Sequence, residues 1–402
     1  MHGQLLLLGV KGLKLTSDEV SLFKKIQPGG FVLFGRNVES PEQFRALTDS
    51  LKDVCEIEPL ITIDQEGGRV TRTREIANEP PSAQQLRKAG DMKKVGGLIA
   101  RHGMITADVL RQLGVNMNLC PVLDISYDDH SDNAMQGRCY GTDAQEVITN
   151  AGIFNANLRH GKVLSCAKHF PSCGLADVDP HHALPFVKKS KEDLMTSDLL
   201  PYTALMPVLD SIMSCHAHFA AIDPDEPGLP GSFSRNLLTQ LLRNQLGYEG
   251  VIMTDDLDMG AIVNTYGRGK DVQMAIEAGN DMAMICHQTE TAGVALDAIK
   301  HVANHVVDES LQRIEKLKKR IVQSPDFKRT LWDKYDAEVM QLRIDTLGEE
   351  AAKMAGAEKD AKYNEAIAAA DNALGAKDYE GAKGKYNEIF IVYINGKSYF
   401  SK

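Results

Sequence analysis

The sequence predicts an α/β fold, a (β/α)8 TIM barrel with a short C-terminal helical hairpin. Short apolar runs recur along the chain, and longer segments with helical periodicity separate them. Alternating strand and helix signals predict βαβ units and a parallel sheet. Eight such runs favour closure of the sheet into a barrel. The runs are Gln4–Val10, Gly30–Phe34, Leu60–Ile63, Val115–Leu119, Val163–Ala167, Ser211–Cys215, Gly250–Thr254 and Asp281–Ile285.

Amphipathic helices are expected between these runs. Clear examples are Glu42–Val54, Val95–Leu113, Asp143–Leu158 and Arg235–Gln245, and Glu309–Val322 would close the barrel. An open, doubly wound sheet is the alternative. That fold predicts a glycine-rich phosphate loop after the first strand, whereas GVKGLKLT follows it here.

The composition divides the chain into three parts. Residues 1–325 carry the barrel pattern, and residues 326–348 form a connecting segment that should pack on the barrel through Trp332, the only tryptophan. Residues 349–402 are rich in Ala, Lys, Glu and Asp and predict a helical hairpin. The pattern from Lys377 to Tyr386 resembles one tetratricopeptide-type unit. A single unit cannot bury its own face, so the hairpin either contacts the barrel or another protein, or is a solvated helix pair.

Charge and composition exclude several classes of partner and compartment. The net charge of −10 argues against a nucleic-acid surface, because phosphate binding needs concentrated Lys and Arg. No stretch approaches the ~20 apolar residues of a membrane span. The N-terminal residues lack the basic and long apolar regions of a signal peptide. Seven cysteines without a CxxC pair predict free thiols, so we expect a cytoplasmic protein.

Polar residues repeatedly follow the apolar runs. In a parallel barrel the chemistry sits at the C-terminal ends of the strands. The residues at these ends are Arg36-Asn37, Asp64-Gln65-Glu66, Asp124, Lys168-His169, His216, Asp255-Asp256 and His287. Packing does not explain so regular a set, which predicts an active site at this end of the barrel.

Five motifs in this order carry a family resemblance. They are the segment Gly30–Asn37 (GFVLFGRN), the segment Ile63–Val70 (IDQEGGRV), the strand ending PVLD at Asp124, the loop from Lys168 to His181 and the strand end Thr254–Met259 (TDDLDM). Together they resemble family 3 glycoside hydrolases, in the β-N-acetylhexosaminidase branch that includes the bacterial peptidoglycan-recycling enzyme. The resemblance covers roughly residues 1–325.

The resemblance implies a retaining exo-β-N-acetylglucosaminidase that acts on peptidoglycan-derived muropeptides. Asp255 aligns with the family nucleophile, and a strand end is a rigid mount for nucleophilic attack. The implied acid/base is His181, supported by Asp179. Pro180 restricts Asp179 to an extended conformation, in which residues two apart share a side. His182 is the competing candidate for the acid/base.

The resemblance also implies a set of residues that hold the sugar. These are Asp64, Arg138, Lys168 and His169, with Arg72 and Asp124 as weaker candidates; Glu66 could instead hold the Gly67-Gly68 turn. Two motifs depart from the family. The chain has Pro171-Ser172-Cys173-Gly174 where the family has PGHG, and Arg138-Cys139-Tyr140-Gly141 where it has RSFG. These changes bear on substrate preference and rate more than on reaction type.

No cofactor is expected, because both implied catalytic groups are side chains. No metal is expected either, since the HxH pattern of His216 and His218 lacks further ligands at suitable spacing. Two other functions stay open. One is a β-glucosidase or broad β-glycosidase of the same superfamily, although the glucosidase branch usually has Trp after the nucleophile, where Asp256 stands here. The other is an inactive barrel that serves as a binding scaffold, with the hairpin as its contact surface.

Overall fold

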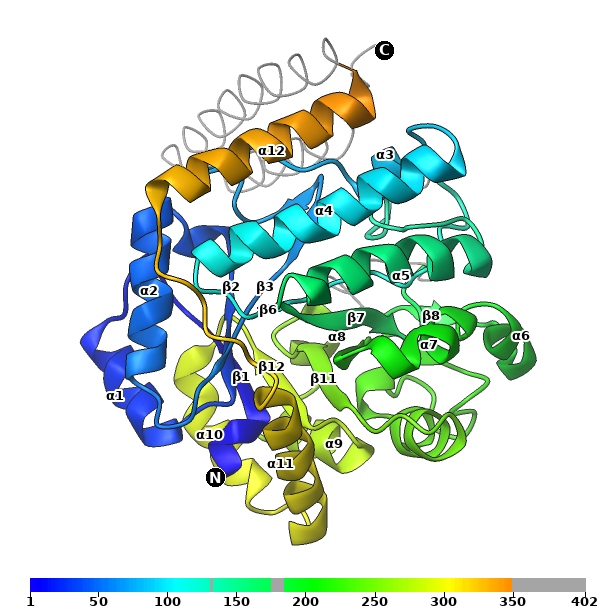
Figure 1. The fold of residues 1–402 in the computed structure, drawn as a ribbon. Coiled ribbons are helices and arrows are strands. Elements are labelled where there is room, and N and C mark those ends of the chain that lie inside the picture. Colours follow the sequence, from blue (N-terminus) through cyan, green and yellow to red (C-terminus); the bar gives the residue numbers. More distant parts are fainter. Residues whose placement is uncertain (131–132, 175–183, 349–402) are drawn as a thin grey trace, which may run out of the picture.

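Eight parallel strands close into a barrel in the computed structural model, which describes residues 1–130, 133–174 and 184–348 (Figure 1). Around the barrel the strands are β1 (Leu6–Gly9), β2 (Gly30–Leu33), β3 (Leu60–Ile63), β6 (Met117–Asn118), β7 (Leu164–Phe170), β9 (Ser211–Ser214), β11 (Val251–Asp256) and β12 (Met282–Ile285). The last strand pairs with the first, with Leu7 opposite Met284. The TIM barrel is therefore confirmed and the open-sheet alternative is wrong.

Helices surround the barrel (Figure 1). The longer ones are α1 (Ser17–Ile26), α2 (Pro41–Asp53), α4 (Met92–Gln112), α5 (Ala144–His160), a π-type helix (Asn236–Gln245), α9 (Lys270–Ala278), α10 (Ala292–Ile299), α11 (Asn304–Lys318) and α12 (Arg329–Leu347). The short ones are α3 (Ala83–Arg87), α6 (Lys191–Thr196), α7 (Leu200–Leu205) and α8 (Gly260–Val263). Side chains cap several N-termini: Thr16 accepts from the Glu19 amide, and Asp143 accepts from the Glu146 amide. The closing helix α11 ends at Lys318, before the predicted end at Val322.

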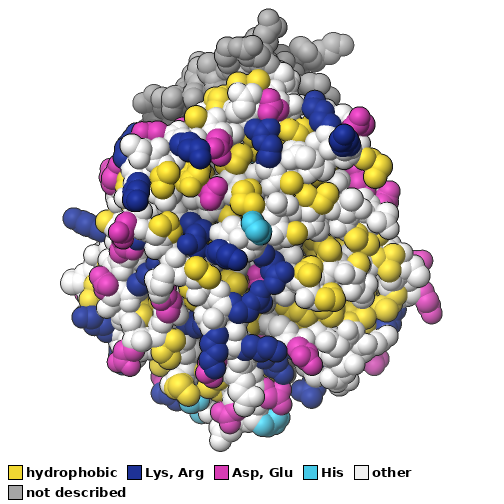
Figure 2. Space-filling view, in the orientation of Figure 1, with side chains coloured by type: hydrophobic (Ala, Val, Ile, Leu, Met, Phe, Trp, Pro, Cys, Tyr) yellow, Lys and Arg dark blue, Asp and Glu magenta, His cyan; other side chains and the backbone are white. Residues whose placement is uncertain are grey.

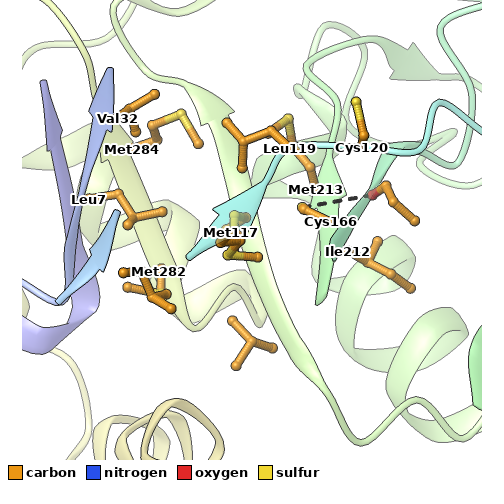
Figure 3. Packing of buried hydrophobic residues seen from close by; sticks show 14 of the residues in the cluster. Leu7, Val32, Met117, Leu119, Cys120, Cys166, Ile212, Met213, Met282 and Met284 are labelled. Atoms are coloured by element: carbon orange, nitrogen blue, oxygen red, sulfur yellow. Dashed lines mark hydrogen bonds between the residues drawn. The ribbon is translucent and has the colours of Figure 1, made fainter. Parts of the chain in front are cut away.

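Apolar side chains fill the interior of the barrel. Figure 3 shows Leu7, Met117, Met213 and Met282 among the side chains packed between the strands. All four are at most 2% exposed. The barrel is thus a solid core rather than a channel, and polar chemistry is confined to the strand ends.

Helix α12 lies along α4 on the outside of the barrel (Figure 1). Trp332 in this helix is buried, with its ring centre 6.5 Å from that of Phe327. Polar contacts add to the packing, since Asp336 accepts hydrogen bonds from Asn78 and Asp345 pairs with Arg101. The predicted hairpin of residues 349–402 lies outside the described residues.

The described surface carries both signs of charge. Figure 2 shows basic and acidic side chains interspersed over one face, with Lys and Arg gathered near its centre. Within residues 1–130, 133–174 and 184–348, none of the helices combines the length and the apolar character that a bilayer crossing demands.

Two strands continue beyond their apolar runs. Strand β7 extends through Lys168 and His169 to Phe170, and β11 includes Asp255 and Asp256. In both, the pairing register shifts at these polar residues, between Ala167 and Phe170 in one strand and between Met253 and Asp256 in the other. Such irregularities locally re-aim side chains, so the polar residues are held by strands while the ladder is interrupted.

Candidate active site

A charged network occupies the C-terminal end of the barrel on the β3 and β7 side. The Lys168 Nζ lies 2.6 Å from Asp64 Oδ1 and 2.7 Å from Glu66 Oε1. Arg72 donates to the other Asp64 oxygen at 3.0 Å. Arg138 makes a bidentate pair with Glu66, at 2.8 Å and 2.7 Å. Both acidic residues are thus shared between cations, and the five side chains form one unit.

The network keeps its charges at neutral pH. Burial alone would raise the pKa of Asp64 and Glu66, but the neighbouring cations outweigh it. Lys168 and Arg72 lower the Asp64 pKa well below its usual range, and Arg138 and Lys168 lower that of Glu66 to about 2. Burial opposes the charge of Lys168 as well, yet Asp64 and Glu66 raise its pKa. The site therefore offers fixed charged donors and acceptors of the kind that bind sugar hydroxyls.

Glu66 reaches this network from a small hairpin formed by β4 (Gln65–Gly67) and β5 (Val70–Thr71). Gly67 has a φ of 98°, and a Cβ there would lie 2.4 Å from the Pro81 carbonyl oxygen. Only glycine fits both conditions. The expectation that Glu66 itself holds the turn is incomplete, because its carboxylate pairs with Lys168 and Arg138.

Asp124 holds the ring of His169. The His169 Nδ1 lies 2.8 Å from Asp124 Oδ2, and the His169 backbone N–H donates to the same oxygen at 3.1 Å. The other oxygen accepts from the amides of Cys173 and Gly174. Burial would raise the Asp124 pKa, but His169 and the Cys173 amide lower it. The carboxylate thus orients the imidazole, whose Nε2 lies 3.4 Å from Arg138.

Asp255 and Asp256 have different surroundings although they are neighbours on β11. Asp255 is half-buried, and its Oδ1 accepts from the Asp256 amide at 2.8 Å. Asp256 is buried, and its Oδ1 accepts from the amides of Asp258 and Cys286 at 3.0 and 3.1 Å. Burial raises the Asp256 pKa to about 7. Asp256 thus joins the end of β11 to that of β12, which leaves Asp255 as the better nucleophile candidate.

The HxH pair does not form a joint metal site in this arrangement. His216 hydrogen-bonds Ser232 Oγ through Nδ1 at 2.8 Å and the Asp256 carbonyl through Nε2 at 2.9 Å. His218 bonds the Leu229 carbonyl at 3.0 Å through Nδ1. Each imidazole thus has its own structural partners.

The structure brings together the five expected sugar-binding residues. Asp64, Arg72, Arg138, Lys168 and His169 lie in one hydrogen-bonded array. Two further carboxylates belong to this array. They are Glu66, for which the sequence suggested a role in the Gly67-Gly68 turn, and Asp124, a weaker sugar-binding candidate. Their position directly after or near strand ends was a usable signal, but their partners are distant in sequence.

The expected acid/base pair, Asp179 and His181, and the alternative His182 lie outside the described residues. The residues on either side of that segment are described. Gly174 is bonded to Asp124, and β8 (Phe186–Val187) pairs with β10 (His218–Phe219), just beyond β9. Both flanks therefore lie at the end of the barrel formed by the C-terminal ends of its strands.

The two motif departures are buried in the loops. Tyr140 packs its ring against Phe154, at 5.6 Å between centres, and its carbonyl accepts from Asn150. Cys139 contacts the Met135 carbonyl through its thiol. These side chains support the loop that carries Arg138 rather than joining the charged network. Cys173 is also buried, and its amide contacts Asp124.

The chain resembles characterised glycosidases along most of its length. The model of the glycosyl hydrolase family 3 N-terminal domain matches residues 2–323. A beta-hexosaminidase of Pseudomonas aeruginosa is 31% identical over 303 residues, which are 75% of this chain and 88% of that protein. A beta-hexosaminidase of Alkalilimnicola ehrlichii is 33% identical over 294 residues, covering 72% and 83%.

The fold is also similar to solved structures of enzymes with related sequences. The family 3 beta-N-acetylglucosaminidase from Paenibacillus sp. str. FPU-7 superimposes with a TM-score of 0.77 at 33% identity, over 86% of this chain and 68% of that one. Native NagZ from Neisseria gonorrhoeae gives a TM-score of 0.72 at 25% identity, over 84% and 97%.

The raised pKa of Asp256 predicts a pH-dependent stability difference. A carboxyl whose folded pKa exceeds its unfolded value stabilises the fold below about pH 4, and that contribution is lost as pH rises through about 7. Asp256→Asn keeps an acceptor oxygen for both amides and cannot ionise. The free energy of unfolding of Asp256→Asn minus that of the wild type, measured by urea denaturation, should therefore increase by about 1 to 3 kcal/mol from pH 5 to pH 8.

Asp256→Ala is the matched control, because it removes the acceptor for the Asp258 and Cys286 amides. It should be less stable than Asp256→Asn at both pH values, by about 1–3 kcal/mol. A constant difference between Asp256→Asn and the wild type across this pH range would contradict the assigned protonation.

Proposed function

Because the chain belongs to glycoside hydrolase family 3, we propose that it is a retaining exo-β-N-acetylglucosaminidase that removes terminal β-linked N-acetylglucosamine. The observation that carries the proposal is the array of Asp64, Lys168, Arg138 and His169 at the barrel end that also bears Asp255. Ionised and paired side chains at the barrel end that also bears a strand-end carboxylate fit a site that binds and cleaves a sugar. The beta-hexosaminidase and beta-N-acetylglucosaminidase names of the relatives support the same choice of sugar.

The proposed natural substrates are muropeptide fragments of peptidoglycan. The unchanged IDQEGGRV motif of the peptidoglycan-recycling branch supports this choice, and its Asp64 and Glu66 lie in the charged network. Six of the seven cysteines are buried free thiols, as is usual in a reducing compartment, so we place the protein in the cytoplasm. The residues beyond 348 remain a candidate protein-contact surface.

Asp255 acts as the nucleophile in the proposed reaction. Its carboxylate attacks the anomeric carbon while the glycosidic oxygen leaves, and water then cleaves the glycosyl-aspartate. The hydrogen bond from the Asp256 amide, together with the position in β11, holds this carboxylate for attack. Side chains supply both catalytic roles, so the proposed reaction requires no cofactor.

His181, oriented by Asp179, acts as general acid and then as general base. The resemblance of the loop and the Asp-x-His spacing support this assignment, because Asp179 can hold one imidazole nitrogen and leave the other for the glycosidic oxygen. The described flanks, which end at the catalytic side of the barrel, are compatible with it.

A substrate panel on the purified protein tests the proposed activity. Aryl β-N-acetylglucosaminide should be hydrolysed at least ~100-fold faster than aryl β-glucoside, since a site built to pair an amide strongly rejects the analogue without it. Equal rates would favour a broad β-glycosidase. Activity on neither substrate, in a folded protein, would favour the binding scaffold.

The stereochemistry of the product tests Asp255. If Asp255 forms a covalent intermediate, two inversions release the β-anomer first, and proton NMR at early times will detect it. Asp255→Ala should lose nearly all activity, by about 10³-fold or more. Initial release of the α-anomer would exclude double displacement.

The leaving group tests the His181 assignment. A nitrophenolate departs without protonation, whereas a sugar needs an acid. His181→Ala should therefore impair cleavage of a disaccharide far more than glycosylation by an activated aryl substrate. Deglycosylation still needs a base, so the aryl substrate should show a burst followed by slow turnover. Azide should accelerate that turnover, because an anion needs no base.

His182→Ala is the matched control and should behave like the wild type. Asp179→Ala should give a weaker form of the His181→Ala pattern, because it orients the ring without transferring the proton. A burst and azide rescue in His182→Ala alone would require exchanging the two histidine roles.

A further inference from the structure

A cavity lies at the N-terminal end of the barrel, away from the charged network. Its volume is about 510 Å³, and it is formed between α7 and α11 where two strands begin. Asp210 directly precedes β9, and Val251 is the first residue of β11. Cavities of about 300–1,000 Å³ are typical of small-molecule sites. Because β11 carries Asp255 near its other end, this cavity and the proposed active site lie at opposite ends of the barrel.

The walls of the cavity differ in chemistry. The segment after α7 and the loop before β11 provide an apolar wall, which consists of Met206, Pro207, Leu209 and Leu246. Helix α11 and the positions just after it provide the cations Arg313, Lys316 and Arg320. These cations are spaced three and four residues apart, which places them on one side of the helix. On the face drawn in Figure 2, Lys and Arg side chains gather beside a broad area of apolar side chains.

Asp210 neutralises Arg320 only in part. The Asp210 side chain is fully buried and pairs with Arg159, at 3.1 Å, as well as with Arg320. One carboxylate is therefore shared between two guanidinium groups. Arg320 reaches it through Nη2, whereas a guanidinium has five N–H donors. Since the Arg320 side chain is 44% exposed and lines the cavity, its other donors are accessible to a ligand there.

Lys316 is the cation with the least compensation. Within the part of the chain that the structure describes, it makes no hydrogen bond or ion pair. Arg313, by contrast, pairs with Asp281 at 3.0 Å and with Glu309 at 2.9 Å. The second acidic residue in the wall is Glu249, which is exposed. Cations thus outnumber acidic groups in this cavity, although the chain as a whole carries a net charge of −10.

We propose that this cavity binds a small amphipathic anion, whose apolar body packs against Met206 and Leu246 and whose carboxylate, phosphate or sulfonate group contacts Lys316 and Arg320. Removal of apolar surface from water favours binding of the body, and charge-assisted hydrogen bonds favour binding of the head group. A neutral apolar molecule would cover the cations without pairing them, and a bare anion would leave the apolar wall in water. The proposal concerns binding alone and does not rest on the proposed function.

The fluorescence of 8-anilino-1-naphthalenesulfonate, an aromatic sulfonate, tests the site in the purified full chain. Its emission should rise as one equivalent binds, and the affinity should fall as salt is added, because ions screen the contact with the cations. Decanoate should displace this probe at a concentration at least ~10-fold lower than decanol, which has a similar chain without the charge. Inorganic phosphate at the same concentration as decanoate should displace none of it. Equal competition by decanol, displacement by phosphate, or no binding of the probe would overturn the proposal.

Lys316→Glu and Lys319→Glu form a matched pair of variants. Both positions are exposed and both changes alter the net charge equally, but Lys319 lies outside the cavity wall and pairs with Glu315. Lys316→Glu should weaken binding of the probe by about 5- to 30-fold, because attraction is replaced by repulsion. Lys319→Glu should stay within about twofold of the wild type. Equal weakening in both variants, or weakening in neither, would contradict the assignment of the head group to Lys316.

N-acetylglucosamine separates this cavity from the proposed active site. Because the two sites lie at opposite ends of the barrel, the sugar should leave the fluorescence of the bound probe unchanged. Displacement of the probe by the sugar would place the probe at the charged network and reject the cavity as its site. If the probe binds as expected but the protein hydrolyses no glycoside, the anion site stands and the proposed enzymatic function fails.

Discussion

The Lys168 ammonium group, held between Asp64 and Glu66, is the interaction on which the rest of the site depends. Lys168 is 2% exposed, and an unpaired buried charge costs several kcal/mol. The two carboxylates compensate it, and Arg72 and Arg138 in turn stabilise those carboxylates. Removing either carboxylate would leave the cations that it pairs with to share the single carboxylate that remains. The network consequently fixes β3, β7 and the loop of Arg138 relative to one another.

The apolar barrel makes this concentration of charge possible. Side chains such as Leu7 and Met213 fill the interior, so polar groups gather only where strands end. The register shifts in β7 and β11 occur at the polar residues, where the regular backbone hydrogen bonds between strands are interrupted and the side chains make contacts of their own. The same arrangement gives Asp255 and Asp256 different surroundings, since the first carboxylate is half-buried and the second accepts hydrogen bonds from amides that follow β11 and β12.

The sequence predicted the barrel well because each strand is buried on both faces and therefore appears as an apolar run. The ends of β7 and β11 could not be predicted this way, since Lys168, His169 and Asp255 continue the strands as polar residues. The charged network was only partly predictable. Asp64 follows its strand directly, but Glu66 meets Arg138 across 72 residues, and a spacing that long leaves no local pattern.

Asp124 connects the proposed sugar-binding residues to the loop proposed to carry the acid and base. One of its oxygens holds the ring and amide of His169, and the other holds the amides of Cys173 and Gly174. That second pair of bonds lies at the start of the segment leading to Asp179 and His181. Loss of the Asp124 carboxylate would therefore release the ring of His169 and the start of that segment together. Cys173 takes part in this link through its backbone amide, so the departure from the family motif at this position leaves the hydrogen bond to Asp124 in place.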